Sequence, residues 1–239
     1  MNETVLITGA SSGIGRELSH MFARAGYHLI LTCSKNIDTL NALSNELQLK
    51  YGIKCCARQC NGANFEEVEA LFSEIKHIDI LINNAGISYV GLLQDMPIEK
   101  WHEIISVNLD SAYYFCKMAI PVFLKQEKGR IINISSVWGN VGASMEVAYS
   151  ASKGGLNSFT KALAKELAMS QIPVNAIACG YIDTPMNAHL SKEEQNEIFE
   201  EIPAGRPGTV NEVSDLALHL AQSPLYLTGQ VITIDGGWT

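Results

Sequence analysis

Short apolar runs alternate with segments of helical period along almost the whole of this sequence. Residues 4–8 and 29–33 are apolar runs of strand length, and the segment between them repeats apolar side chains with the spacing of one helix face. Strands that alternate with helices are typical of βα units, whose strands are parallel. The alternation therefore predicts an α/β protein with a parallel sheet that is buried on both faces.

This alternation continues to the end of the chain. Further strands are expected at residues 53–60, 80–83, 130–134, 174–178 and 231–234, and long helices at 101–124 and 150–169. No linker or internal repeat divides the 239 residues, so we expect one domain over 1–239, with a Rossmann-like, doubly wound, seven-stranded parallel sheet and helices on both faces. Residues 185–208 are too long for an ordinary connection and are expected to form a substrate lid.

The composition argues against several classes of function. With 17 basic and 25 acidic residues the formal net charge is −8, which is not the charge of a nucleic-acid-binding protein. No apolar run approaches the ~20 residues of a membrane-spanning helix. The six cysteines contain no CxxC pair and no signal peptide precedes the first strand, so we expect reduced thiols, no metal site and a cytoplasmic location.

A glycine-rich turn follows the first predicted strand in the sequence TGASSGIG. Backbone amides and the dipole of the following helix can hold a pyrophosphate at such a turn. The spacing is GxxxGxG, which differs from the GxGxxG of the general dinucleotide fingerprint. The residues expected to bind a dinucleotide here are Gly9, Ser11, Ser12, Gly13, Ile14 and Gly15.

Tyr149 and Lys153 are four residues apart, which is about one helical turn, at the start of the predicted helix 150–169. Residues at this spacing lie on one face of a helix. An ammonium group beside a phenol favours the phenolate and lowers a pKa that is ordinarily about 10. The pair is therefore predicted to act as a general acid and base.

These motifs, together with NNAG at 83–86, Asn108 and the Ser136 of INISS, resemble the short-chain dehydrogenase/reductase family from Thr4 to the final DGGWT. The resemblance implies a nicotinamide-dependent oxidoreductase that interconverts a ketone and a secondary alcohol. It implies that Tyr149 exchanges a proton with the carbonyl oxygen, that Ser136 donates to the same oxygen and that Lys153 holds the nicotinamide ribose. It also implies that Asn108 helps to hold a water chain that leads to Lys153.

The resemblance implies further cofactor contacts. Asn84, Ala85 and Gly86 would lie beside the adenine ribose, although Asn83 and Asn84 could equally serve only to shape a tight strand exit. Asn61 stands where relatives carry an acidic residue near the adenine. Ile182 and Thr184 would bind the nicotinamide carboxamide, after a turn in which Cys179 replaces the proline of the family.

Cofactor preference is read at the end of the second predicted strand. An Asp or Glu there would bind a ribose 2′-hydroxyl. The sequence instead has Ser34 and Lys35, which could receive the 2′-phosphate of NADP(H). Lys35 could also be a solvated loop residue, and Ser12 stands where many NADP-dependent relatives carry a basic residue. We expect NADP(H) to be favoured over NAD(H).

The overall pattern is nearest to the 3-oxoacyl-(acyl-carrier-protein) reductases, through the GRIINISS, GRPG and DGG elements. Glu127 and Ser170 replace the basic residues with which those relatives meet the carrier, while Lys125, Lys128 and Arg130 remain nearby. A free hydroxysteroid, polyol or keto ester, and a non-catalytic cofactor sensor, are the alternatives. The expected substrate pocket comprises Ser136, Trp138, Met145, Tyr149, Tyr181 and Met186.

The resemblance also implies a homotetramer, formed through the two long helices and the last strand. Leu156, Phe159, Leu163 and Leu167 lie on one side of the second of those helices and are the residues expected to face a partner.

Overall fold

The computed structural model describes residues 3–188 and 190–239. Its centre is a seven-stranded parallel sheet in the order β3-β2-β1-β4-β5-β6-β7. This confirms the predicted doubly wound α/β fold. The strands are β1 Thr4–Ile7, β2 His28–Cys33, β3 Cys55–Gln59, β4 Ile80–Asn83, β5 Arg130–Ser136, β6 Val174–Cys179 and β7 Val231–Ile234.

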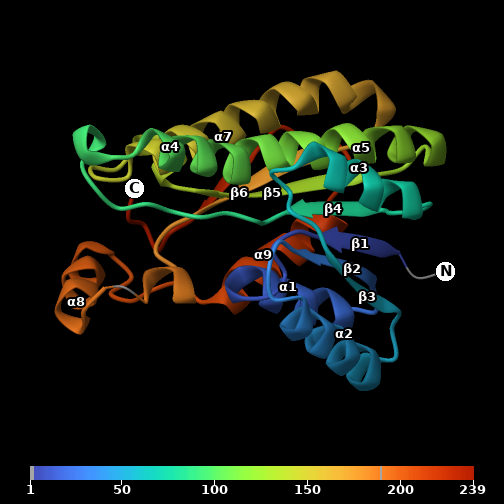
Figure 1. Cartoon of the computed structure of the whole chain (residues 1–239), viewed down its shortest axis with the longest axis horizontal. Helices are drawn as coiled ribbons and strands as arrows, with labels where there is room; N and C mark the ends of the chain where they lie inside the picture. The colour runs from blue at the N-terminus through green and yellow to red at the C-terminus, as the bar shows by residue number, and fades with distance from the viewer. Residues whose placement is uncertain (1–2, 189) are drawn as a thin grey trace.

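Two layers of helices cover the sheet (Figure 1). One face carries α1 Gly13–Arg24, α2 Ile37–Tyr51 and α9 Val210–Gln222, and the other carries α3 Phe65–Glu74, α4 Ile98–Ile105, α5 Ser111–Gln126 and α7 Val147–Leu167. Each layer has its own cluster of buried apolar residues against the sheet. Burial on both faces explains why the strands are almost continuously apolar in sequence.

Other helical segments include α6 Trp138–Val141 after β5, the 3₁₀ turn Pro185–Asn187 after β6 and α8 Lys192–Glu201 before α9. Helix α8 stands apart from the two layers in Figure 1, on the side where the chain ends. Its N-terminus is fixed by a capping box, in which Ser191 and Glu194 satisfy each other's backbone amides. Helix α8 is acidic and mostly exposed, and it lies within the segment 185–208 that the sequence predicts to be a lid.

The sheet has its switch point between β1 and β4. Strand β1 pairs with β2 on one side and with β4 on the other, so the connections that leave β1 and β4 diverge to opposite faces of the sheet. In an open parallel sheet this divergence leaves a crevice at the carboxyl ends of the strands. The loops that follow β1, β2, β4, β5 and β6 all reach this edge.

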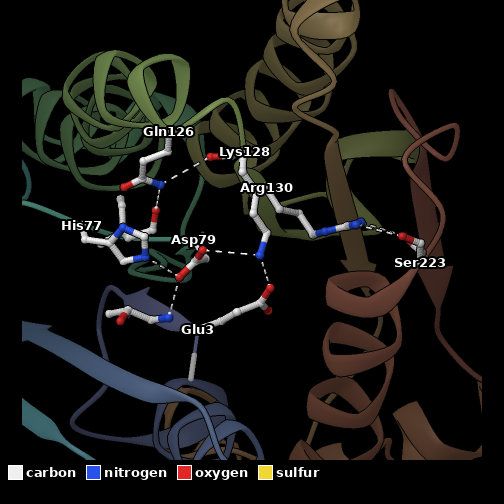
Figure 2. Close-up of polar contacts among 9 residues, drawn as sticks. Glu3, His77, Asp79, Gln126, Lys128, Arg130 and Ser223 are labelled. Atoms are coloured by element: carbon white, nitrogen blue, oxygen red, sulfur yellow. Dashed lines mark hydrogen bonds and ion pairs between the residues drawn. The ribbon is translucent and has the colours of Figure 1, made fainter. Parts of the chain in front are cut away.

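At the amino ends of the strands, opposite the crevice, several polar groups contact the buried carboxylate of Asp79 (Figure 2). Its Oδ2 accepts a hydrogen bond from the Thr4 amide at 2.8 Å and lies 2.9 Å from His77 Nε2. Lys128 lies 3.6 Å from the other carboxylate oxygen and also contacts Glu3. These contacts hold β1 to the start of β4, and they occupy the Lys128 ammonium.

Arg130, at the start of β5, is also engaged within the fold (Figure 2). Its Nη1 donates to the Leu220 carbonyl at 2.7 Å and its Nη2 donates to the Ser223 carbonyl at 2.8 Å. The side chain is buried. Lys128 and Arg130, which the sequence left open as carrier contacts, therefore both have intramolecular partners.

The structure corrects three details of the sequence prediction. The predicted helix 101–124 consists of α4 and α5 with a π-helical turn, Ser106–Asp110, between them. Strand β3 is shorter than 53–60. Leu156, Leu163 and Leu167 of α7 are buried in the chain's own core, and Phe159 packs against it, so this stripe does not face a partner.

Within residues 3–188 and 190–239, no helix combines the length and the apolar character that crossing a bilayer requires. The same part of the chain contains no group of three or more metal-binding side chains, and all six cysteines are free thiols.

Candidate active site

A cavity of about 590 Å³ opens at the carboxyl edge of the sheet. It runs from the glycine-rich turn after β1, past the ends of β4 and β5, to the segment after β6. Most of the residues predicted from sequence line it, namely Gly9, Ser11, Ser12, Gly13, Ile14, Gly15, Ser34, Lys35, Asn61, Asn84, Ala85, Gly86, Ser136, Trp138, Tyr149, Lys153, Tyr181, Ile182, Thr184 and Met186.

Two predicted site residues, Asn108 and Met145, do not line the cavity. The Met145 side chain is 45% exposed, and its backbone carbonyl accepts a hydrogen bond from the Gly91 amide at 2.8 Å. Its backbone has a left-handed φ of 64°, which belongs to the turn before α7. Met145 is therefore a turn residue, and the prediction that it forms a pocket wall does not hold.

The glycine-rich turn comes too close to neighbouring backbone to accept side chains. Gly9 has a left-handed φ of 64°, and a Cβ there would lie 2.8 Å from Ala85 Cα. A Cβ at Gly15 would overlap the Gly9 carbonyl. The first amides of α1, which begins at Gly13, have no partner within the helix. A smooth backbone concavity at a helix N-terminus fits a dinucleotide pyrophosphate.

The NNAG turn braces this cradle. Asn84 Nδ2 donates to the carbonyls of Thr8 at 2.9 Å and Gly9 at 3.1 Å, and its backbone amide donates to Thr8 Oγ1 at 2.9 Å. Asn83 Nδ2 donates to Asn133 Oδ1 at 2.8 Å on the next strand. Both asparagines therefore shape the strand exit, which is one of the two roles that the sequence left open for them.

The far end of the cavity is formed by the residues after β2 and β3. Lys35 is exposed at the rim, and the neighbouring Ser34 carbonyl accepts a hydrogen bond from Gln59 at 3.1 Å. Asn61 Oδ1 accepts the Ala63 amide at 3.2 Å. The oxygen of Asn61 is thus used in its own turn, although the residue lines the cavity.

The other end of the cavity holds Tyr149 and Lys153, one turn apart on α7. Lys153 Nζ lies 5.7 Å from the centre of the Tyr149 ring and donates to the Ile134 carbonyl at 2.9 Å. Ser136 is the last residue of β5, and its Oγ accepts a hydrogen bond from the Trp138 amide at 3.2 Å. Strand β5 and helix α7 therefore bring a phenol, a hydroxyl and an ammonium to one point.

Burial controls the proton affinities at this point. It lowers the pKa of Lys153 to about 8 and raises the pKa of Tyr149 well above its usual range, and a hydrogen bond with Ser136 only partly opposes the second shift. The net shift of the tyrosine pKa is therefore opposite to the predicted lowering, because desolvation dominates in this structure. Tyr149 is a protonated phenol at neutral pH.

Asn108 acts from behind the cavity wall. It lies buried in the π-helical turn, where its Oδ1 accepts the Ile87 amide at 2.8 Å. Its Nδ2 donates to the Ile87 carbonyl at 2.9 Å and to Ser152 Oγ at 3.0 Å. A Cβ at Gly86 would lie 3.4 Å from both Asn108 Oδ1 and Lys153 Nζ. The Asn108 oxygen and the Lys153 ammonium therefore both lie next to Gly86.

The lining residues that sequence reasoning missed include Asn36, Glu146 and Trp238. Asn36 takes a left-handed φ of 61° to begin α2. Trp238, near the end of the chain, lies against Trp138. The Asp-Gly-Gly turn before Trp238 was the available signal, since such turns reverse the chain toward the strand that they follow.

Comparisons with known proteins agree with this site. A family model described as short chain dehydrogenase matches residues 3–195. The 3-oxoacyl-[acyl-carrier-protein] reductase FabG of Aquifex aeolicus is 40% identical over 237 residues, which cover 97% of this chain and 95% of that protein. The chain belongs to the short chain dehydrogenase family.

Two further proteins are similar to this chain over nearly its whole length. The oxidoreductase YmfI of Bacillus subtilis, described as uncharacterized, is 38% identical over an alignment that covers all of this chain and 99% of YmfI. A crystal structure from Beutenbergia cavernae has a TM-score of 0.93 and 34% identity, and the match covers 99% of this chain and 96% of that chain. Its description gives NAD(P)-dependent gluconate 5-dehydrogenase only as a candidate activity, with NADP bound at low occupancy.

Membership of the short chain dehydrogenase family makes this chain an NAD(P)-dependent oxidoreductase that acts on CH–OH groups. The glycine cradle and the cavity that runs from it to Tyr149 fit such a cofactor, because the pyrophosphate end and the proton-donating end lie in one continuous space.

Proposed function

We propose that this chain is a cytoplasmic, NADP(H)-dependent reductase that converts a 3-oxoacyl thioester into the 3-hydroxyacyl thioester. The observation that carries the proposal is the convergence of Ser136, protonated Tyr149 and Lys153 at one end of the cavity, where the other described walls are mainly apolar. The 3-oxoacyl reductases among the relatives support the same substrate class.

The chain's own residues supply the proton and the charge stabilisation. A reduced nicotinamide bound in the cavity would supply the hydride for the carbonyl carbon. Tyr149 donates its phenolic proton to the carbonyl oxygen, for which its raised pKa suits it at neutral pH. Ser136 donates a hydrogen bond to the same oxygen as negative charge develops there. Lys153 stabilises the phenolate that remains, and Asn108 positions the segment around Gly86 beside it.

The charges around the cavity favour an uncharged ketone over a sugar acid. Among its described lining residues, the cations are Lys35 at the rim and Lys153 at the catalytic end. Glu146 lines the same end, and its negative charge contributes to the raised pKa of Tyr149. The carboxylate of a gluconate-type substrate would be repelled by Glu146 without an arginine to bind it.

The preference for NADP(H) rests on Ser34 and Lys35. These residues follow β2 and line the cavity, where an acidic side chain would otherwise bind the 2′-hydroxyl. An exposed ammonium at this rim suits a 2′-phosphate.

The proposed reaction does not require that the acyl group be attached to a carrier protein. Glu127 and Ser170 stand where relatives have basic carrier contacts, while Lys128 and Arg130 have intramolecular partners. We therefore propose that thioesters on a small carrier, such as coenzyme A, are reduced at least as well as those on an acyl carrier protein.

The test is a substrate panel followed by nicotinamide absorbance. It comprises 3-oxoacyl thioesters on coenzyme A and on acyl carrier protein, a keto ester, a ketosteroid and 5-ketogluconate, each with NADPH and NADH. We expect the thioesters with NADPH to give the highest kcat/KM. A higher value for 5-ketogluconate would overturn the proposal. Binding of NADPH without turnover of any ketone would instead support a cofactor sensor.

A further inference from the structure

The last residues of the chain form part of the catalytic end of the cavity. The rings of Trp138 and Trp238 have centroids 4.8 Å apart at an interplanar angle of 59°, and both side chains line the cavity. Trp138 lies two residues beyond Ser136, which is the expected hydrogen-bond donor to the ketone. The paired rings therefore lie near the reacting carbonyl, although their residues are a hundred positions apart in sequence.

This placement of Trp238 is built by the turn that precedes it. Asp235 Oδ1 accepts the Gly237 amide at 2.9 Å, and Oδ2 accepts the amide and the hydroxyl of Thr239 at 2.9 and 3.0 Å. Partial burial raises the pKa of Asp235, but the hydrogen bonds from the tail outweigh it and hold the pKa below the ordinary value. The carboxylate closes the tail into a loop around Trp238.

The same tail is seated on the segment that follows α8. Gly236 has a left-handed φ of 69°, and a Cβ there would lie 2.9 Å from both the Ala204 Cβ and an Ile202 methyl group. The Gly236 carbonyl accepts the Ala204 amide at 3.1 Å. Ile202, at the end of α8, is almost fully buried. The tail is thus held from two sides.

We propose that Trp238 is a specificity-determining residue that forms, with Trp138, an aromatic wall for the apolar carbon chain attached to the ketone. This inference rests on the proposed function and narrows it to 3-oxoacyl groups of medium or greater length. Asp235 is the positioning residue, because it holds the tail that carries Trp238.

Part of the remaining lining is also apolar and agrees with an apolar occupant. Met186, Leu190 and Ile198, from the segment that includes α8, also line the cavity. Two indole rings and three aliphatic side chains favour methylene groups over the hydroxyl groups of a polyol, which would lose hydrogen bonds to water there. Each methylene that such a wall binds is worth about tenfold or more in discrimination.

The experiment compares two thioesters of N-acetylcysteamine, 3-oxobutanoyl and 3-oxooctanoyl, with NADPH. We expect the unmodified enzyme to prefer the 3-oxooctanoyl substrate. Trp238→Ala should lower kcat/KM for the 3-oxooctanoyl substrate by about tenfold or more, mainly through KM, and for the 3-oxobutanoyl substrate by less than about threefold. Trp238→Phe should keep most of the preference for the longer substrate, and Asp235→Asn should weaken that preference.

The matched control is Trp101→Ala, which removes an indole from α4 outside the cavity lining. It should leave the ratio of the two kcat/KM values unchanged. Equal losses for both thioesters in Trp238→Ala, or an unchanged ratio, would overturn the inference.

A binding measurement separates this inference from the proposed function. Octanoyl-N-acetylcysteamine, which has no ketone to reduce, is titrated calorimetrically into the protein with NADP⁺ bound. Weakening by about tenfold in Trp238→Ala but not in Trp101→Ala supports the wall, even if the unmodified protein reduces neither thioester. Failure to reduce both thioesters contradicts the proposed function alone, and equal affinity in all three proteins contradicts the wall.

Discussion

The chemistry of this site is set by two ionisable groups that the fold removes from water. Lys153 is buried, and its ammonium donates a hydrogen bond to the Ile134 carbonyl. The sequence spacing predicted that Tyr149 and Lys153 share a helix face, and the structure confirms it. The spacing could not predict the direction of the tyrosine pKa, because desolvation depends on β5 and β6, which pack against α7 from elsewhere in the sequence.

Burial of Lys153 makes part of the stability depend on pH. The pKa of Lys153 is about 8 in the folded protein, whereas its ordinary value of 10.5 applies to the unfolded chain. Between these two pH values the unfolded chain therefore binds more protons than the folded protein. The contribution of Lys153 to the free energy of unfolding therefore rises with pH across that window, by an amount on the order of 3 kcal/mol.

Lys153→Met provides the comparison. Urea unfolding of both proteins at about pH 7 and about pH 10 should show the stability of the unmodified protein rising relative to the variant at the higher pH. Cysteine and tyrosine titrations occur in both proteins and cancel in the difference. A difference that is the same at the two pH values would show that Lys153 is not charged and buried as described.

Cofactor preference is a second property that belongs to one residue. Lys35→Asp places a carboxylate beside the expected 2′-phosphate, and we expect kcat/KM with NADPH to fall by about tenfold to a hundredfold while NADH gains. Lys54→Asp makes the same charge change at an exposed position outside the cavity lining and should have little effect. Equal kcat/KM for both cofactors in the unmodified protein would refute the assignment.

At the scale of elements, the π-helical turn between α4 and α5 is the feature that sequence reasoning did not find. The apolar pattern of 101–124 predicts a helix correctly, but it has no residue type that marks a change from α to π hydrogen bonding. The turn places Asn108 against the backbone of Ile87. The stripe on α7 shows the same limit, since periodicity identifies an apolar face without saying which layer covers it.

Asn108→Leu tests the role of this turn. The amide and the carbonyl of Ile87 would lose their partners, so we expect the protein to be destabilised by about 1–3 kcal/mol in urea and kcat to fall as well. Asn41→Leu, at an exposed position of α2, is the matched control and should change neither property appreciably. Full stability in Asn108→Leu would mean that the Ile87 segment is held by other contacts.

At the scale of the whole molecule, the alternation of strands and helices sufficed to predict the fold, because each element repeats the same rule of burial. Assembly is different, because the stripe once expected at an interface is part of the core. The homotetramer stays a prediction, and the open edge at β7 with the exposed Leu225 and Tyr226 before it is a surface through which copies could associate.

We expect light scattering to give the mass of four chains at micromolar concentration. The open edge of β7 would pair or pack against another copy, which is a common way to protect such an edge. A mass of 26.1 kDa, that of one chain, would contradict this prediction.

The central claim is that Tyr149 donates the proton during reduction, and Tyr149→Phe tests it most directly. The variant keeps the ring, its packing against Lys153 and the glycine cradle, so only the proton donor is lost. The measurement pairs kcat for 3-oxooctanoyl thioester reduction with a fluorescence titration of NADPH. We predict that kcat falls by ~10²–10⁴-fold while NADPH affinity is retained. Near-normal turnover by a folded Tyr149→Phe variant would show that the proton comes from another group and would contradict the account of this site.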